Sequence, residues 1–300
     1  MPAQSALTEK ATLGKTAEPP VRAARWQGRH QVMLVPLLIF LAVFFAYPLL
    51  DTFLRSIGAP DQPFTLAHYR RVIDRPVYLR LFQITFEIAF STSAVTLFLG
   101  YPVAYLMTRA RPRALSLCLV CVLTPFFTSV LVRTYAWMVI LSPEGVLNQS
   151  LAKLGLGRVE LIYNRPGVLI AMTYTLLPYM VLTLYSVFRG IDLKLFLAAY
   201  NLGASDWQVF HRVFLPLSLP GVAGGFLLVF ILGLGYFITP SLMGGPGDQM
   251  VAMVIYEQVE RTLNWHFASA LSIILLVVTL AGFLLYDRVV GLRTLLESKF

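Results

Sequence analysis

Two ionisable residues, Glu87 and Arg133, lie within strongly apolar stretches of this 300-residue sequence. If these stretches cross a membrane, each charge costs roughly 2.5–3.5 kcal/mol at the bilayer centre, so such side chains usually face a cavity or each other. Glu87 and Arg133 are placed at comparable depth, and an ion pair between them is the favoured arrangement. Direct contact of Glu87 with a cationic substrate and snorkelling of either side chain to the headgroups are the alternatives.

Other reactive residue types do not form a catalytic or metal site. Cys118 and Cys121 form a C-x-x-C motif, but it lies on an apolar stretch without the polar, accessible surroundings that thiolate chemistry needs, so we expect both to be packing residues. The histidines are scattered, with no nucleophile beside a base: His30, His68, His211 and His266. No G-x-x-x-x-G-K-[ST] loop is present. We therefore expect no enzyme activity, metal or cofactor in this chain.

The composition places these residues in a membrane protein. Hydrophobic residues make up 57% of the chain and charged residues 13%, with a mean hydropathy of +0.71, whereas soluble domains carry about 25% charged residues. The expected fold is all-α and polytopic, because apolar runs long enough to span the hydrocarbon core recur along the chain. Six spans are predicted, at about 31–50, 81–107, 114–141, 167–188, 221–243 and 267–286.

The distribution of basic residues predicts the orientation. Residues 1–30, 108–113, 189–220 and the segment after 286 hold fourteen of the 24 Lys and Arg, and the segments on the other side hold nine. Because Lys and Arg concentrate in cytoplasmic segments, both termini are predicted in the cytoplasm. Tails 1–30, which we expect to be disordered, and 289–300 then flank a six-helix transmembrane domain at 31–288. Most of the +9 net charge is accounted for by orientation, so nucleic acid is not expected as a partner, whereas membrane lipid is.

The segment 190–220, between the fourth and fifth spans, predicts two short helices joined by a tight turn. Asp192 can cap a helix over residues 193–202, which Gly203 would end in a left-handed conformation. Ser205 then begins a second helix, with Gln208 three residues later completing a capping box. The first helix has almost no polar face, and the second places Trp207, Phe210 and Phe214 on one face. Apolar surface outside the membrane needs a partner, either headgroups or protein.

The same segment resembles a family signature. Ala198, Ala199 and Gly203, followed after nine intervening residues by the run from Val213 to Pro216, match the EAA motif of the permease subunits of binding-protein-dependent ABC importers. The resemblance continues through residues 99–105, 131–137, 145–151, 177–186 and 244–250, and it is strongest to spermidine/putrescine-type permeases. One departure is Leu197, which stands where the family has a glutamate.

The resemblance implies a type I (MetI-like) permease fold in a bacterial inner membrane. It also implies that the loop docks as a coupling helix into a groove of a separate ATP-binding subunit, present in two copies. A second homologous permease subunit and an extracytoplasmic solute-binding protein would complete the importer. The residues expected in the coupling loop are Ala198, Ala199, Gly203, Ala204, Ser205, Trp207, Phe210 and Pro216.

A polyamine substrate would need carboxylates for charge and aromatic faces for cation–π contact. The residues that could line such a pathway near the outer half are Glu87, Arg133, Tyr135, Trp137, Tyr174, Tyr179, Tyr236, Glu257 and Glu260. Opines, thiamine and ferric iron are alternative solutes. An ion-coupled secondary carrier and a membrane scaffold that transports nothing are alternative functions, although no inverted repeat of the kind many carriers contain is detected.

Overall fold

A computed structural model describes residues 27–58 and 64–290. The predicted tails lie mostly outside these ranges. Residues 27–51 belong to a first unit, which contains α1 (Gln27–Leu41), a π-helical turn (Ala42–Ala46) and the start of α2 (Tyr47–Ser56). These three elements form one continuous helix, which includes the first apolar stretch long enough to cross a membrane.

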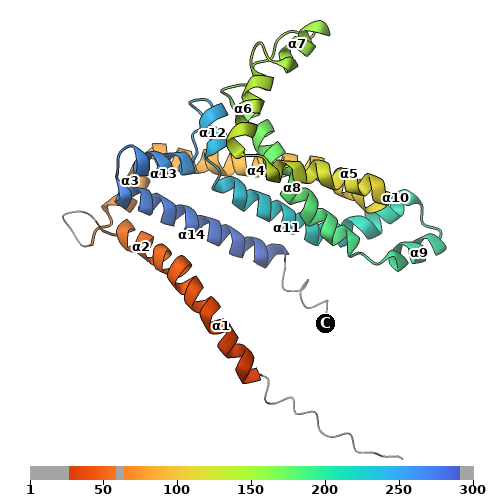
Figure 1. Ribbon diagram of the computed structural model, residues 1–300, viewed down its shortest axis with the longest axis horizontal. Helices are drawn as coiled ribbons and strands as arrows, with labels where there is room; N and C mark the ends of the chain where they lie inside the picture. Colours follow the sequence, from red (N-terminus) through yellow and green to blue (C-terminus); the bar gives the residue numbers. More distant parts are fainter. Residues whose placement is uncertain (1–26, 59–63, 291–300) are drawn as a thin grey trace, which may run out of the picture. The chain divides into compact units, whose positions relative to one another are not determined.

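The second unit, from Thr52 onward, contains the remaining elements, and no strand occurs in the ranges that the structure describes (Figure 1). Six helices of the two units together are long and apolar enough to span a bilayer. The elements of the second unit after α2 are α3 (Ala67–Asp74), α4 (Pro76–Arg109), α5 (Pro112–Leu123), η3 (Thr124–Phe127), α6 (Val130–Leu141), α7 (Val146–Lys153), α8 (Arg165–Arg189), α9 (Leu193–Asn201), α10 (Asp206–Val209), η4 (Phe210–Phe214), α11 (Leu215–Leu234), α12 (Ile238–Met243), α13 (Val251–Glu260) and α14 (Trp265–Val290).

Helices α4, α8 and α11 form the centre of the second unit. Helix α8 begins where the Asn164 side chain accepts a 3.1 Å hydrogen bond from the Gly167 amide, which satisfies a donor that the first turn leaves unpaired. Its apolar side chains along the helix, from Val168 to Leu184, are among the most deeply buried of the residues that the structure describes. A 3.0 Å hydrogen bond between the hydroxyls of Tyr101 and Ser218 joins α4 to α11.

Glycines allow α11 to approach α8 closely. A Cβ atom at Gly225 of α11 would lie 2.8 Å from the Met180 sulfur, and one at Gly221 would lie 2.9 Å from the Val187 Cβ. Small residues at such positions are typical of membrane helix pairs, because close van der Waals packing takes the place of the hydrophobic effect inside lipid.

The predicted third span, residues 114–141, is two helices rather than one. Helix α5 ends in the 3₁₀ turn η3, which contains Pro125, and α6 begins only at Val130 after an extended Thr128. Proline removes a backbone donor and its ring obstructs the helix, and here the run breaks at Pro125 instead of continuing as a kinked helix. In Figure 1, α5 lies along the central helices, whereas α6 and α7 project away from them.

The fifth long helix begins earlier than predicted. Asp206–Leu234 is continuously helical through α10, η4 and α11, so Pro216 passes the loop into the span instead of ending it. Pro216 lies two residues after the π-helical turn η4, and Pro220 lies one turn further on. One end of the bundle is formed by α9 and α10, the predicted coupling loop, and is called the coupling end below; the opposite end includes α3 and α13 (Figure 1).

Candidate coupling surface and pathway residues

The turn between α9 and α10 has the local structure that the sequence predicts. Oδ1 of Asp192 accepts a 2.9 Å hydrogen bond from the Lys194 amide and caps α9. Gly203 has φ of +81°, a left-handed conformation that glycine adopts without strain. Ser205 and Gln208 form the capping box, with the Gln208 side chain accepting from the Ser205 amide at 2.9 Å. The helix, the turn and both caps are confirmed.

The coupling end presents apolar side chains to its surroundings. Leu197 is 62% exposed, Leu202 is 88% exposed and Trp207 is 69% exposed. Ala198 and Pro216 are also exposed, whereas Ala199 and Ala204 are half-buried. Since an exposed leucine and tryptophan surface of this kind is costly in water, the coupling end is suited to binding another protein or the membrane surface.

An aromatic cluster anchors this surface to the core helices. The ring centroid of Phe214 lies 4.9 Å from those of Tyr105 in α4 and Phe188 in α8, in edge-to-face geometry. Phe210 stacks at 5.8 Å from Phe214, and Trp207 at 6.0 Å from Phe210. Along the predicted aromatic face, the exposure of the side chains therefore increases from the buried Phe214 to the exposed Trp207. Edge-to-face packing of this kind stabilises by about 0.5–1.5 kcal/mol per pair, so the aromatic cluster holds the surface against α4 and α8.

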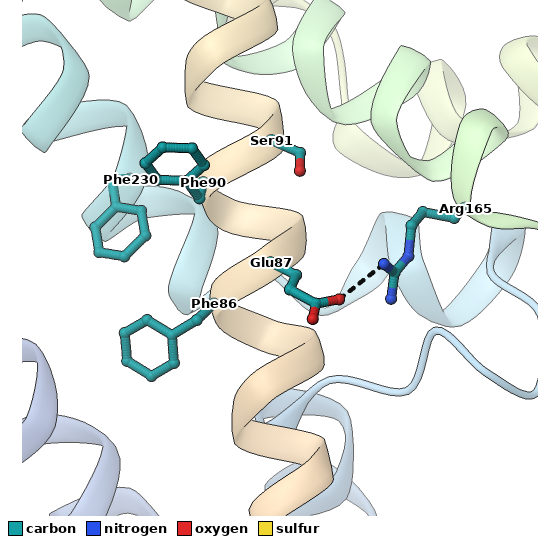
Figure 2. Close-up of a pocket in the computed structure, with 6 residues that line it drawn as sticks. All are labelled: Phe86, Glu87, Phe90, Ser91, Arg165 and Phe230. Carbon is teal, nitrogen blue, oxygen red and sulfur yellow. Dashed lines mark hydrogen bonds and ion pairs between the residues drawn. The ribbon is translucent and has the colours of Figure 1, made fainter.

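At the opposite end, Glu87 forms an ion pair, but with Arg165 rather than with Arg133. The Arg165 guanidinium donates from a terminal nitrogen to Oε2 of Glu87 at 2.8 Å and from Nε to Oδ1 of Asp248 at 3.2 Å. Figure 2 shows Glu87 of α4 pointing toward Arg165 at the start of α8. The second carboxylate oxygen of Glu87 accepts from Gln83 at 2.8 Å. Each carboxylate oxygen of Glu87 thus accepts one hydrogen bond, one from a cation and one from an amide.

The favoured Glu87–Arg133 ion pair is wrong. Arg133 lies on α6, a helix that follows the break at Thr128, and its Nε is buried without a hydrogen-bond partner among the described residues. The adjacent Thr134 bonds to Thr239 of α12 at 3.1 Å. Equal depth along the membrane normal does not place two residues on facing helix surfaces, and the apolar pattern does not determine the direction in which α6 projects.

The remaining pathway candidates are dispersed. Trp137 packs against Tyr174 at 5.5 Å, Tyr179 packs against Phe126 at 4.9 Å, and the Tyr236 hydroxyl is buried without a partner in the described residues. Tyr135 and Glu260 are exposed, and Glu257 lies 4.0 Å from Arg261 one turn along α13. Their roles in a pathway stay predictions.

Two residues of the ion network, Arg165 and Asp248, were missed as site residues by sequence reasoning. Asp248 follows a run of glycines between α12 and α13, and the Gly245 amide donates to its Oδ2 at 3.1 Å. Its side chain is only 8% exposed. A carboxylate inside a glycine-rich loop at a span end was the available signal, whereas Arg165 resembled any other basic residue outside the apolar runs.

The pattern of spans and the capped loop agree with a known family. Residues 97–292 match the family described as the binding-protein-dependent transport system inner membrane component. The chain belongs to this family of ABC importer permeases. It is 34% identical to the spermidine/putrescine transport system permease protein PotB of Haemophilus influenzae over 85% of this chain and 88% of the relative. It is 35% identical to PotB of Escherichia coli over 75% of this chain and 82% of that protein.

Solved permease structures share the fold. A chain of the bacterial ABC transporter that imports the acidic polysaccharide alginate matches with a TM-score of 0.69 and 20% identity, covering 87% of this chain and 94% of the other. A chain of the MetNI methionine ABC transporter matches with a TM-score of 0.54 and 17% identity, covering 70% and 92%. The fold is therefore the MetI-like permease fold.

Membership of the permease family decides between the functional alternatives that the sequence left open. The chain is an inner-membrane transport subunit and not an enzyme, since the family consists of the membrane components of binding-protein-dependent systems. It is also not an ion-coupled secondary carrier or a scaffold that transports nothing.

Proposed function

We propose that this permease forms half of the translocation core of an ABC importer for a polyamine such as spermidine or putrescine. A second, homologous permease would form the other half, two copies of an ATP-binding subunit would bind the coupling ends, and an extracytoplasmic solute-binding protein would deliver the substrate. The similarity to PotB over most of both chains carries the substrate assignment. PotC of Escherichia coli, a spermidine/putrescine permease that is 28% identical over 74% of this chain, supports a pair of unlike permeases.

The coupling end supports the pairing with an ATPase. The capped turn at Gly203 holds α9 and α10 in a fixed geometry, while Leu197, Leu202 and Trp207 are exposed. An apolar surface on a rigid support is suited to a protein groove, because little conformational entropy is lost on docking. Leu197 replaces the glutamate of the motif, so the facing wall of the ATPase groove would be apolar at this position.

The orientation follows from the same docking. The coupling end would face the cytoplasm, as would both tails, 1–30 and 289–300, in agreement with the excess of Lys and Arg in these segments. The Glu87–Arg165–Asp248 network then lies toward the outside, where a delivered substrate enters the bundle.

Uptake of radiolabelled spermidine tests the proposal. The chain, its second permease, the ATPase subunit and the solute-binding protein are expressed together in a bacterial host without polyamine uptake. We expect uptake that requires all four proteins and is abolished by loss of the P-loop lysine in the ATPase subunit. Uptake of thiamine, an opine or ferric iron in place of spermidine would contradict the substrate and leave the permease function intact.

A further inference from the structure

The Glu87–Arg165 ion pair lies where two pockets meet along α4. An outer pocket of about 570 Å³ is lined by residues of the first turns of α4, among them Pro76 and Arg80, and by Gly247. An inner pocket of about 490 Å³ is lined by Ser91 and three phenylalanines, Phe86, Phe90 and Phe230. Glu87 and Arg165 line both pockets. Any solute that moves between the pockets along α4 meets this pair.

The charges of the network favour exchange of one cation for another. Two carboxylates, Glu87 and Asp248, share a single guanidinium, so the three groups carry a net charge of −1. Arg80 is exposed and forms no ion pair among the described residues. If Arg165 left Glu87, it would keep its bond to the buried Asp248, whose position the Gly245 amide fixes. The released Glu87 would keep its hydrogen bond from Gln83 and its negative charge, and would be open to a new cation.

The pair itself is accessible enough to exchange. The side chains of Glu87 and Arg165 are 43% and 40% exposed, so the contact is solvated on one side. Figure 2 shows Ser91 one turn beyond Glu87 on the same side of α4, with Phe86, Phe90 and Phe230 on the other side of the helix. A flexible alkylammonium that leaves Glu87 would meet a hydroxyl and then aromatic faces, both of which bind ammonium groups.

We propose that the Arg165 guanidinium binds the Glu87 carboxylate in place of a substrate ammonium group, and that the incoming polyamine displaces the guanidinium. The ion pair thus closes the connection between the outer and inner pockets when substrate is absent, and Asp248 holds the displaced guanidinium. This inference rests on the proposed polyamine function. It identifies Glu87 as the first ammonium site in this chain and Arg165 as the residue that sets its affinity.

A double-mutant cycle tests the exchange. Radiolabelled spermidine is bound to the assembled transporter in nanodiscs without solute-binding protein, for the wild type, Arg165→Gln, Glu87→Gln and the double variant. We expect Arg165→Gln to tighten binding by about two- to fivefold, the factor that corresponds to a partly exposed ion pair. Glu87→Gln weakens binding, and Arg165→Gln has no further effect when Glu87 is already changed.

The control is Arg70→Gln, which removes the same charge from an exposed 3.2 Å ion pair with Asp74 and should leave binding unchanged. If Arg165→Gln tightened spermidine binding equally with and without Glu87, the exchange would be overturned. Arg165 would then repel the polyamine through its charge alone, independently of Glu87. No change in either background would overturn it as well. If the Arg165→Gln complex does not assemble, Arg165→Lys is measured, since lysine lacks the fork that bridges two carboxylates, and a smaller tightening is expected.

The uptake assay separates this inference from the proposed function. If the wild-type transporter imports spermidine but the cycle shows no coupling between Glu87 and Arg165, only the exchange falls. If the transporter imports a neutral or anionic solute and no polyamine, both fall.

Discussion

The Tyr200 hydroxyl donates a 2.8 Å hydrogen bond to Oδ1 of Asp206, joining the end of α9 to the start of α10 across the Gly203 turn. The bond to the Asp206 carboxylate raises the pKa of Tyr200 above its ordinary value. A raised pKa means that the bond is present at neutral pH and is lost only as the pH rises past the raised value, well into the alkaline range. At physiological pH the turn is therefore closed by this bond in addition to the two helix caps.

Substitutions of Gly203 test whether binding of the ATPase subunit depends on the left-handed backbone of this turn. A Cβ at this position has no neighbour within 4 Å, but its φ of +81° is strained for most side chains by about 1–2 kcal/mol. We expect Gly203→Val to weaken binding of the ATPase subunit by up to about thirtyfold and Gly203→Asn to weaken it less, because asparagine tolerates the left-handed region. Binding of the purified ATPase subunit to the permease pair in nanodiscs measures both, and equal losses for Asn and Val would contradict the backbone explanation.

Restoring the glutamate of the family motif should reduce coupling. Leu197→Glu places a carboxylate on an exposed apolar surface. Burial of this carboxylate in the ATPase groove without a cationic partner would cost several kcal/mol, reduced by any water that stays bound to it. We expect uptake and ATPase binding to fall at least about tenfold. Leu156→Glu, an equally exposed leucine in the loop after α7, is the matched control and should leave ATPase binding unchanged. Tighter binding by Leu197→Glu would show that the groove keeps a basic residue.

Two neighbouring glycines of α11 should differ in their tolerance of alanine. A Cβ at Gly221 would lie 2.9 Å from the Cβ of Val187, whereas one at Gly224 has no neighbour within 4 Å. Because valine is branched at Cβ and cannot turn away, overpacking in Gly221→Ala should cost about 1–3 kcal/mol. Thermal unfolding of the assembled transporter should shift downward for Gly221→Ala and not for Gly224→Ala. Equal shifts would mean that the close approach of α11 and α8 is not needed for stability.

Much of the architecture was predictable from the sequence because apolar runs, caps and glycine turns act locally. Asp192, Gly203 and Ser205 each determine their own turn, so the α9–α10 unit was predicted almost residue by residue. The break between α5 and α6 was harder to predict from the sequence, since an apolar run that contains Pro125 is compatible with a kinked helix as well as with two helices.

The ion network illustrates what local patterns leave undetermined. Glu87, Arg165 and Asp248 come from three segments separated by about eighty residues each, and their meeting depends on how α4, α8 and the α12–α13 loop pack. Chemistry correctly indicated that Glu87 would have a cationic partner. The identity of that partner is a property of the tertiary structure.

A histidine pair at the opposite end should make the stability pH-dependent. His68 of α3 and His266 of α14 are stacked with centroids 6.2 Å apart. Burial lowers the pKa of His68 below about 6.5, and the charges of His266 and Arg71 lower it further, against a rise from a hydrogen bond to the Gly58 backbone. The folded state therefore favours neutral His68, and this stability is present above about pH 6.5 and is lost as the pH falls.

Thermal unfolding of the assembled transporter at pH 7.5 and 5.5 measures the effect. The wild type should lose more stability on acidification than His68→Gln, whose side chain does not titrate. His211→Gln, which removes an exposed histidine of η4, should behave like the wild type. An identical loss for the wild type and His68→Gln would place the pH dependence elsewhere.

The unbroken helix Asp206–Leu234 connects the coupling end to the opposite end of the bundle through 29 residues. At 1.5 Å of rise per residue it is a rod about 43 Å long. A tilt of about ten degrees at the end that carries Trp207 would displace the other end by about 7 Å, given that length. No loop interrupts the helix between Trp207 and Leu234, so a tilt at one end is lost before the other only by bending at the π-helical turn Phe210–Phe214 or at the prolines that follow it.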